Sequence, residues 1–472
     1  MRELIAVLGA EVPSGRAVAK MLRAERYSCA LMASGASAQE VARQSPAGII
    51  LAGEAQEGAA PPDAGLLALQ IPLLALGSSA RALLSRLGAR AEGASVERAV
   101  LPVTYQESPL FEKVESGERW IARAEPYAVS GAYRTIAEGG GFPLAFASDD
   151  SRVFLIQFQI ERNDLDGMAM LLAFAGTVCG CEPWWTAENV IADAERMIRE
   201  AAGEGEAICA MSGGLDSTVA AVLANRALGR DRARCVFVDT GLFRQGEAEE
   251  AERYFRQELN LNFSRASAGG HILRALKGLS AAHDKWRVID AEIARTLGEA
   301  AGNMPGASIL VKGTHYLDTL YMGQAKSAGQ SPAVAEPLRG LFKDEVRMIG
   351  EYLSLSPALL GRQPFPGMGL AGRIHGEVDA ERLEIVRRAD AIFCGALADS
   401  GQDKRLSVYC AILQRVCGHD MIILRAAQGV EAKSAARLPY DLLERIVEQI
   451  RRELPSVDRV LYDMTPGALE WA

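Results

Sequence analysis

Short apolar runs alternate with helix-like segments through most of the chain. The clearest runs are Ala207–Met211, Arg234–Gly241 and Ala307–Thr314, and Met1–Leu8 has the pattern of a first strand. Each run has the length of a buried strand, and the segments between the runs have helical spacing. Because such alternation is typical of stacked α/β layers, the pattern predicts an α/β protein with mainly parallel sheet.

The most informative connection in this pattern is Ser212–Ser217, which reads Ser-Gly-Gly-Leu-Asp-Ser between the run 207–211 and the helical pattern 218–223. The two glycines let the backbone approach an anion, and the hydroxyls and N–H groups can donate to it. Since a carboxylate repels bare phosphate, we expect Asp216 to hold a magnesium ion that bridges to a pyrophosphate. The alternative is a tight glycine turn with no ligand. The loop lacks the Gly-Lys-Ser/Thr ending of a Walker A motif.

Composition narrows the classes of protein. The 472 residues suffice for two to four domains, and 49% hydrophobic with 24% charged residues is ordinary for a globular protein. The net charge of −9 provides no overall basic field for nucleic acid, although it leaves room for a local basic pocket. Polar residues interrupt the longest apolar stretch, Leu66–Leu84, which therefore predicts strand, turn and helix rather than a membrane span.

The cysteines and the N-terminus do not indicate secretion. The eight cysteines lack the spacing of a disulfide framework, and the N-terminus lacks a signal-peptide cleavage pattern. Cys179 and Cys181 are the one close pair, but a single intervening residue suits a tetrahedral metal poorly. We expect a cytoplasmic protein.

Three domains are predicted along the chain. Residues 1–185 form a first α/β domain, and a helix over 187–202 leads into the strand before the Ser-Gly-Gly loop. Residues 186–356 hold the three later runs, and the turns after these runs are expected to meet at the carboxyl edge of one sheet. Residues 357–472 form a third domain of helices and short strands.

The loop Ser212–Ser217 resembles the PP-loop of the ATP pyrophosphatases, which cleave ATP between its α and β phosphates. Over nearly the whole chain the sequence is similar to the GMP synthetase family, which converts XMP to GMP. The segments that carry this likeness are 179–186, 212–217, 237–244, 336–339, 341–347, 363–369, 373–378, 438–443 and 469–471. The resemblance implies a class I glutamine amidotransferase-like domain, a PP-loop domain, an α+β C-terminal dimerisation domain, and a homodimer.

The resemblance also implies a reaction. In the family, a nucleobase carbonyl oxygen attacks the α-phosphate of ATP, pyrophosphate leaves, and ammonia then displaces AMP. ATP and Mg²⁺ are the implied cofactors, Asp216 and Lys343 the catalytic pair, and Asp216 and Asp344 the magnesium carboxylates. The positions implied to hold the pyrophosphate are Ser212, Gly213, Gly214, Leu215, Asp216 and Ser217.

Two further pairs of residues receive roles from the same resemblance. Val238 and Gly241 would flank the adenine. Lys285 and Arg287 lie where the family has a mobile basic segment that closes over ATP. The alternative for Arg287, as for Lys343, is a solvated surface charge, which is the commoner fate of a single basic residue.

The N-terminal domain departs from the family wherever glutamine hydrolysis needs a reactive group. Gly77 stands at the position of the nucleophilic cysteine, and Ser78 lies one residue further along without an adjacent base. Gln159 replaces the histidine of the base, and an amide cannot take a proton from a thiol at neutral pH. The oxyanion turn is reduced to residues 52–54, where Glu54 would repel an oxyanion. We expect this domain not to hydrolyse glutamine.

The acceptor side is altered as well. Ser407 stands where the family has a glutamine that contacts the purine nucleotide, and the C-terminal tail lacks the lysine expected at the 5′-phosphate. Each lost charge-assisted contact costs ~1.5–3 kcal/mol. Arg373, Arg425 and Glu470 remain as candidate acceptor contacts, with structural ion pairing as the alternative for the two arginines.

Three functional hypotheses follow. The first is a ligase that adenylates XMP or another purine-like acceptor and uses free ammonia or ammonia from a separate glutaminase. The second is a nucleotide-binding pseudoenzyme or a regulator of a true GMP synthetase. The third, a tRNA-modifying PP-loop enzyme, is disfavoured by the acidic net charge and the lack of a recognisable RNA-binding appendage. No nucleic-acid or membrane partner is expected.

Overall fold

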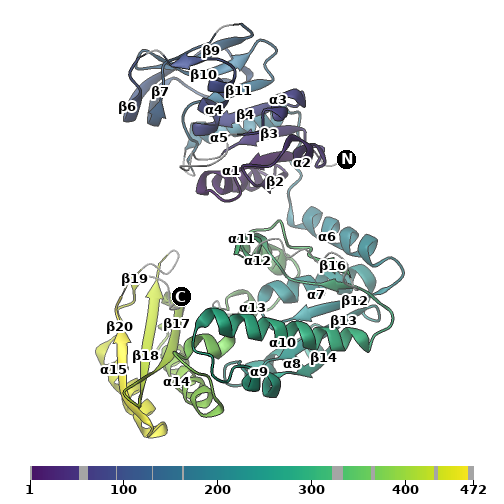
Figure 1. Ribbon diagram of the computed structural model, residues 1–472, viewed down its shortest axis with the longest axis vertical. Coiled ribbons are helices and arrows are strands. Elements are labelled where there is room, and N and C mark those ends of the chain that lie inside the picture. The colour runs from purple at the N-terminus through teal and green to yellow at the C-terminus, as the bar shows by residue number, and fades with distance from the viewer. Residues whose placement is uncertain are drawn as a thin grey trace. The chain divides into compact units, whose positions relative to one another are not determined.

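The chain folds into two compact units, Met1–Val190 and Ile191–Ala472. The computed structural model describes residues 3–52, 62–91, 93–129, 131–161, 164–321, 333–362, 367–429 and 434–465. Parallel sheets and helices in both units (Figure 1) confirm the predicted α/β class. The division into three domains stays a prediction. The predicted domains 186–356 and 357–472 lie together in the second compact unit, except for residues 186–190, which belong to the first unit. Within these ranges no helix has the length and apolar character that a membrane crossing needs.

A nine-stranded sheet lies at the centre of the first unit, in the order β2-β1-β3-β4-β11-β10-β9-β6-β7. The parallel strands are β2 (Cys29–Met32), β1 (Ile5–Leu8), β3 (Gly48–Leu51), β4 (Leu73–Leu76) and β11 (Val153–Ile156). The antiparallel strands are β10 (Phe142–Ser148), β9 (Tyr133–Gly139), β6 (Val96–Tyr105) and β7 (Gly117–Ala124), and β5 (Arg90–Ala91) pairs separately with β8 (Tyr127–Ala128). Strands β1, β3 and β4 are buried along their whole length, which is why they read as continuous apolar runs.

The helices of the first unit follow the parallel strands. They are α1 (Pro13–Ala24), α2 (Ala38–Ala42), α3 (Gly65–Ala68), α4 (Ser78–Arg86) and α5 (Leu165–Leu172), with short helical turns η1 (Pro109–Phe111) and η2 (Ala173–Val178). The stretch 66–84 thus contains a buried strand and a helix joined by a turn at Gly77, in agreement with the sequence pattern.

A five-stranded parallel sheet organises the second unit, in the order β14-β13-β12-β15-β16. Its strands are β14 (Asn262–Ser267), β13 (Ala233–Asp239), β12 (Glu206–Met211), β15 (Ala307–Val311) and β16 (Ala333–Ala335). The three predicted strands of this region are therefore confirmed as β12, β13 and β15. Because β12 is the middle strand, the loop that follows it lies at the centre of the carboxyl edge.

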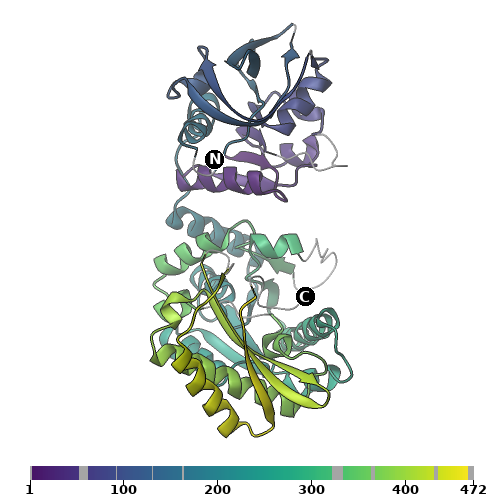
Figure 2. The same cartoon turned by 90° about the vertical axis from the view of Figure 1, so that its left-hand side faces the viewer.

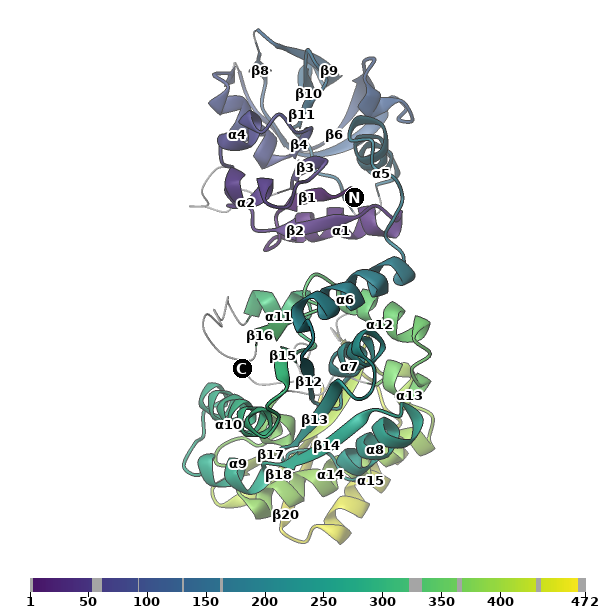
Figure 3. The ribbon, with the colours of Figure 1, turned by 90° about the vertical axis from the view of Figure 1, so that its right-hand side faces the viewer.

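Helices cover this sheet, with α7 beside β12 and α12 beside α7 (Figure 3). The helices are α6 (Ala187–Ala202), α7 (Leu215–Leu228), α8 (Glu247–Arg253), η3 (Tyr254–Glu258), α9 (Gly269–Ala275), α10 (Ala282–Gly302), α11 (Tyr316–Tyr321), α12 (Lys343–Tyr352) and α13 (Pro357–Leu360).

The C-terminal part of the second unit is a four-stranded sheet with helices α14 (Ala380–Asp399) and α15 (Tyr440–Glu453). Strand β18 (His419–Gln428) pairs with β17 (Val408–Val416), β19 (Ser434–Ala435) and β20 (Val457–Asp463), which Figure 2 draws in yellow-green. Short turns η4 (Gly369–Arg373) and η5 (Asp403–Arg405) flank α14. One hydrophobic core contains Ile208 and Val236 from the five-stranded sheet together with Phe393 of α14 and Leu424 of β18.

The cysteines of the chain are all free thiols, and Cys29, Cys181, Cys209, Cys235 and Cys410 are buried. Burial raises the pKa of the Cys181 thiol to about 11 and also raises that of Cys179. A thiol with a raised pKa is mostly protonated at neutral pH and is a poor metal ligand or nucleophile.

Candidate active site

The loop between β12 and α7 is closed by its own serines. The Ser212 N–H donates to Ser217 Oγ at 3.2 Å, and the two hydroxyl oxygens lie 3.1 Å apart. Ser217 Oγ and Thr218 Oγ1 both donate to the Gly214 carbonyl, at 3.1 and 2.8 Å. Gly213 has φ +82°, a conformation that side chains disfavour, so the tight turn needs glycine there. The loop therefore has a defined shape at the positive N-terminal end of α7.

A pocket of about 360 Å³ opens beside this loop. It brings together most of the residues that the sequence assigns to ATP and pyrophosphate: Ser212, Gly214, Leu215, Asp216, Val238 and Lys343 all line it. The lining comes from the ends of β12 and β13 and from the start of α12, which lie far apart in the sequence. Two of the three turns predicted to meet at one sheet edge, those after β12 and β13, thus line the pocket, and the turn after β15 is absent from the described lining.

Asp216 and Lys343 face each other across the pocket. The Lys343 ammonium forms an ion pair with Asp216 Oδ2, from the first residue of α12 to the first turn of α7. The other carboxylate oxygen, Asp216 Oδ1, is buried and has no hydrogen-bond partner in the described part of the chain. A carboxylate oxygen without a hydrogen-bond partner among the described residues can serve as one ligand of an ion such as Mg²⁺, which takes its remaining ligands from phosphate and water.

Asp344, the second predicted magnesium ligand, follows Lys343 in α12 but is absent from the described pocket lining. Within the described ranges, no group of three histidine, cysteine, aspartate or glutamate side chains is placed to hold a metal ion. A magnesium ion at this loop would therefore depend on substrate phosphates as ligands, with Asp216 as the protein carboxylate. The role of Asp344 stays a prediction.

Three charged residues that received no role from the sequence also line the pocket: Glu247, Arg347 and Arg362. Arg362 Nη1 donates to the Gly213 carbonyl at 2.9 Å, and Arg362 Nη2 forms an ion pair with Glu247. Arg362 thereby holds the Ser-Gly-Gly loop from outside. A signal was present in the sequence, because Arg347 ends the segment 341–347 and Arg362 directly precedes the segment 363–369 that carry the family likeness.

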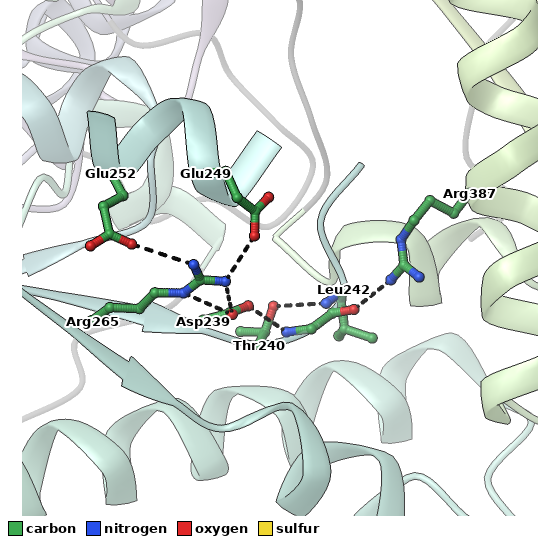
Figure 4. Close-up of polar contacts among 8 residues, drawn as sticks. Asp239, Thr240, Leu242, Glu249, Glu252, Arg265 and Arg387 are labelled. Carbon is green, nitrogen blue, oxygen red and sulfur yellow. Dashed lines mark hydrogen bonds and ion pairs between the residues drawn. The ribbon is translucent and has the colours of Figure 1, made fainter. Parts of the chain in front are cut away.

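The turn after β13 forms another wall of the pocket through Val238, Thr240 and Phe243. Asp239 closes this turn, because its Oδ1 accepts the Gly241 N–H at 2.9 Å. Figure 4 shows Asp239 Oδ2 held in turn by Arg265, whose guanidinium also contacts Glu249 and Glu252. These carboxylates, with Asp239 first, raise the pKa of Arg265 and keep it charged. Gly241, predicted at the adenine, is therefore fixed beside the pocket wall.

Lys285 and Arg287, the predicted lid residues, lie in the first two turns of α10 and outside the described pocket lining. Lys285 is only 2% exposed, and its Nζ donates to the Ile374 carbonyl at 2.7 Å. Burial, with a smaller effect of Arg382, lowers the pKa of Lys285 to about 8. Arg287 is exposed and has Asp284 at 4.0 Å as its ion partner. Their roles at ATP stay predictions, and the structure gives Lys285 a different partner.

The candidate acceptor residues Arg373 and Arg425 are both buried and ion-paired. Arg373 Nη1 lies 2.8 Å from Asp390, and Arg425 Nε lies 3.1 Å from Asp463. The structure thus shows ion pairs of the kind that the sequence left as the alternative for both arginines. Glu470 lies outside the described residues.

The first unit places Gly77 and Gln159 in contact. Gly77 lies between β4 and α4 with φ +55°, and a Cβ built on it would lie 2.2 Å from Gln159 Nε2. The amide therefore fills the space of a nucleophile side chain. Both residues line a cavity of about 610 Å³, together with Ser78, Arg81 and Trp120. Of the predicted oxyanion turn only Ala52 is described, because residues 53 and 54 lie outside the described ranges.

Comparison with known proteins gives a consistent result. A family model described as NAD synthase matches residues 189–408, which include the Ser-Gly-Gly loop and Lys343. Over its full length the chain is 32% identical to glutamine-hydrolyzing GMP synthase of Clostridium novyi (strain NT), of which it covers 99%. It is 34% identical over 92% of its length to the GMP synthase of Geobacillus kaustophilus (strain HTA426), of which 92% is covered. The corresponding protein of Parafrankia sp. (strain EAN1pec) is 36% identical, with 92% of this chain and 90% of the relative covered.

Proposed function

The chain belongs to the GMP synthase family, and from this we propose that it is an ATP-dependent ligase that aminates XMP or an XMP-like purine without hydrolysing glutamine itself. The observation that supports the ATP half is the pocket in which Asp216 and Lys343 face each other beside the Ser-Gly-Gly loop. The observation that supports the missing glutaminase is the contact between Gly77 and Gln159. Ammonia would then come from solution or from a separate glutaminase.

The reaction has two displacement steps. In the first, the purine carbonyl oxygen attacks the α-phosphorus of ATP, the bond to the bridging oxygen of the β-phosphate breaks, and pyrophosphate leaves. In the second, ammonia forms a bond to the activated carbon, the carbon–oxygen bond breaks, AMP leaves, and a proton passes to solvent. The residues around the pocket would act mainly on the first step, through positioning and charge stabilisation.

The loop residues can receive the leaving pyrophosphate. Ser212, Gly213 and Gly214 lie at the N-terminal end of α7, where the helix dipole favours a negative charge. Lys343 can donate from its ammonium to the β and γ phosphates once it leaves Asp216, which frees that carboxylate for the metal. A magnesium ion bound there would supply positive charge to the departing phosphates. Arg347 and Arg362 add two guanidinium groups to the same wall.

We propose a homodimer formed through the C-terminal part, and Arg373, Arg425 and Glu470 as residues near the acceptor. For the two arginines the observed ion pairs favour a role in positioning over direct contact. Asp344, Lys285 and Arg287 remain candidate residues at the metal and the ATP lid. Gel filtration with light scattering tests the dimer independently of activity.

Release of pyrophosphate tests the proposed reaction. Purified protein with ATP, Mg²⁺, XMP and an ammonium salt should release pyrophosphate, and glutamine in place of ammonium should give neither GMP nor glutamate. The Asp216→Asn variant should lose pyrophosphate release by a factor of roughly 10² or more, because the metal-bridged leaving group loses its anchor. Asp231→Asn changes an exposed carboxylate and serves as the matched control.

Each part of the proposal has an outcome that contradicts it. Release of pyrophosphate with another purine but not with XMP would reject XMP and keep the reaction class. Glutamate release by the wild-type protein would reject the missing glutaminase. Retained ATP binding with no pyrophosphate release for any purine acceptor would favour a nucleotide-binding regulator over an enzyme.

A further inference from the structure

The turn after β13 has two sides with different partners. On one side, Thr240 and Phe243 line the pocket beside the Ser-Gly-Gly loop. On the other side, the backbone carbonyls of the turn meet the C-terminal part of the unit. Gly241 O accepts from Arg387 Nη2 at 2.7 Å, and Phe243 O accepts from Arg387 Nε at 3.0 Å. A single guanidinium of α14 thus holds two carbonyls of this turn, and Figure 4 shows Arg387 beside the turn with one of these two bonds.

The carbonyl between these two is held from the same direction. Leu242 O accepts the Leu370 N–H of η4 at 2.8 Å. Gly369 allows this approach, because it has φ +58° and a Cβ on it would lie 2.5 Å from Leu242 O. Three consecutive carbonyls of the turn, at 241, 242 and 243, are therefore fixed by residues of 369–387.

A buried ion pair makes a second connection between α14 and the turn. Arg244 Nε lies 3.0 Å from Asp390 Oδ2, and Asp390 is 2% exposed in its side chain. Asp390 Oδ1 pairs with Arg373 at 2.8 Å and accepts the Ala411 N–H of β17 at 3.1 Å. Separating such a buried ion pair leaves an uncompensated charge, which is unfavourable. The turn and β17 are therefore both held to Asp390 of α14.

The connection continues to the Ser-Gly-Gly loop. The backbone N–H of Arg244 donates to Glu247 Oε2 at 2.7 Å, and the other carboxylate oxygen of Glu247 forms an ion pair with Arg362. Arg362 in turn donates to the Gly213 carbonyl at 2.9 Å. Both walls of the pocket, the turn after β13 and the loop after β12, are thereby linked to α14 through polar contacts.

We propose that Arg387 is a positioning residue for ATP, through which helix α14 fixes the pocket wall formed by residues 239–244. This inference rests on the proposed ATP-dependent function, and it adds a device by which the C-terminal part sets ATP affinity. Arg387 lies outside the described pocket lining, so it acts through the carbonyls of Gly241 and Phe243. A lysine cannot reproduce two hydrogen bonds from one rigid planar group.

ATP affinity and turnover separate this role from a purely structural one. We would measure the Kd for ATP by isothermal titration without acceptor, and the KM for ATP and kcat by pyrophosphate release. Arg387→Lys and Arg387→Gln should raise Kd and KM for ATP by about tenfold, because ATP would then bind only the fraction of molecules in which the released wall is in place. The kcat at saturating ATP should change by less than about twofold, because once ATP is bound the wall is restored by the ligand itself.

The neighbouring Arg388 supplies the matched control. Its guanidinium pairs with Glu453 of α15 and lies 3.3 Å from the Gln245 side chain, but it holds no carbonyl of residues 241–243 in the described contacts. Arg388→Gln should leave Kd and KM for ATP within about twofold of wild type. Thermal unfolding of every variant shows whether it is folded at the assay temperature, and Arg387→Lys keeps the charge if Arg387→Gln is too unstable.

The outcomes distinguish the inference from the function on which it rests. Wild-type ATP binding with unchanged Kd in the folded Arg387 variants would overturn the inference alone. Equal losses of ATP affinity in the Arg387 and Arg388 variants would overturn it too, because they would show a general effect of weakening α14. A wild-type protein that does not bind ATP would overturn the proposed function, and the inference with it.

Discussion

Introducing a cysteine at Gly77, the position that the family resemblance assigns to a nucleophile, should destabilise the first unit. Gly77 has φ +55° and ψ −121°, which a residue with a Cβ adopts only at a cost of about 1–3 kcal/mol. A Cβ there would also lie 2.2 Å from Nε2 and 2.6 Å from Cδ of Gln159, far inside van der Waals contact. These atoms are the far end of a flexible side chain that lines a cavity, so the Gln159 amide can turn away at a cost of about 0.5–1.5 kcal/mol in a less favourable rotamer. The Gly77→Cys variant should therefore lose about 1.5–4.5 kcal/mol of stability.

Two further variants separate the two contributions. Gly88 has φ +82° but open space within 4 Å of the point where a Cβ would stand, so Gly88→Cys should show the backbone cost without the overlap. Adding Gln159→Ala to Gly77→Cys removes the overlap and should return about 0.5–1.5 kcal/mol as a favourable coupling in the double-mutant cycle.

Thermal unfolding of the full chain, followed by circular dichroism, measures these differences. For a unit of this size 1 kcal/mol corresponds to about 2–4 °C in Tm. Gly77→Cys should unfold at least about 3 °C below wild type and also below Gly88→Cys. Equal midpoints for the Gly77 and Gly88 variants, or a double-mutant cycle with no coupling, would refute the view that Gln159 occupies the space of the lost nucleophile.

Two other predictions concern the second unit. Gly313→Ala should lower pyrophosphate release at least about tenfold, because its Cβ would lie 2.6 Å from the backbone of Asp216 and Ser217. The control is Gly298→Ala in α10, where a Cβ would meet open space. This variant should keep its activity and gain up to about 1 kcal/mol of stability. Normal activity of Gly313→Ala would contradict the tight packing of the loop. Below the folded-state pKa of about 8, Lys285 is protonated in both the folded and the unfolded chain, so burial of its charge lowers the free energy of unfolding. This loss of stability disappears as the pH rises from about 8 toward the ordinary pKa of 10.5, because the buried amine is then neutral. Urea unfolding at pH 7 and pH 10 should therefore show wild type gaining stability relative to Lys285→Met, by at most about 3 kcal/mol, and a pH-independent difference would contradict the buried charge.

The strands and the Ser-Gly-Gly loop of the second unit were predictable because their signals are local. A buried parallel strand is a short apolar run, and the ends of β12, β13 and β15 follow directly from such runs. The pairing of Asp216 with Lys343 joins residues 127 positions apart, and it was accessible only because both lie in segments that carry a family likeness. The contact of Arg362 with Gly213, over 149 positions, was missed, because the place of Arg362 next to the segment 363–369 does not indicate which residue it contacts.

Side-chain burial was the property that the sequence could not supply. Lys285 belongs to a basic segment that suggests an exposed, mobile lid, yet the structure buries it against the Ile374 carbonyl beside Arg382 and His375. The choice depends on whether α10 packs against η4, which is a tertiary contact and leaves no periodic trace in a short segment. The same limit applies to Arg387, whose two carbonyl partners lie 144 and 146 positions away.

The ion pair of Arg373 restricts how an acceptor nucleotide can be recognised. Its guanidinium is 4% exposed and pairs with Asp390, which also neutralises Arg244. An acceptor phosphate that recruited Arg373 would have to leave Asp390 with one cation fewer in a buried site, and separating such a pair costs about 3–5 kcal/mol. A charge-assisted hydrogen bond to the phosphate returns only about 1.5–3 kcal/mol. Direct binding through Arg373 is therefore unfavourable, and the role that its contacts favour is to hold Asp390 so that α14 keeps the ATP pocket wall in place.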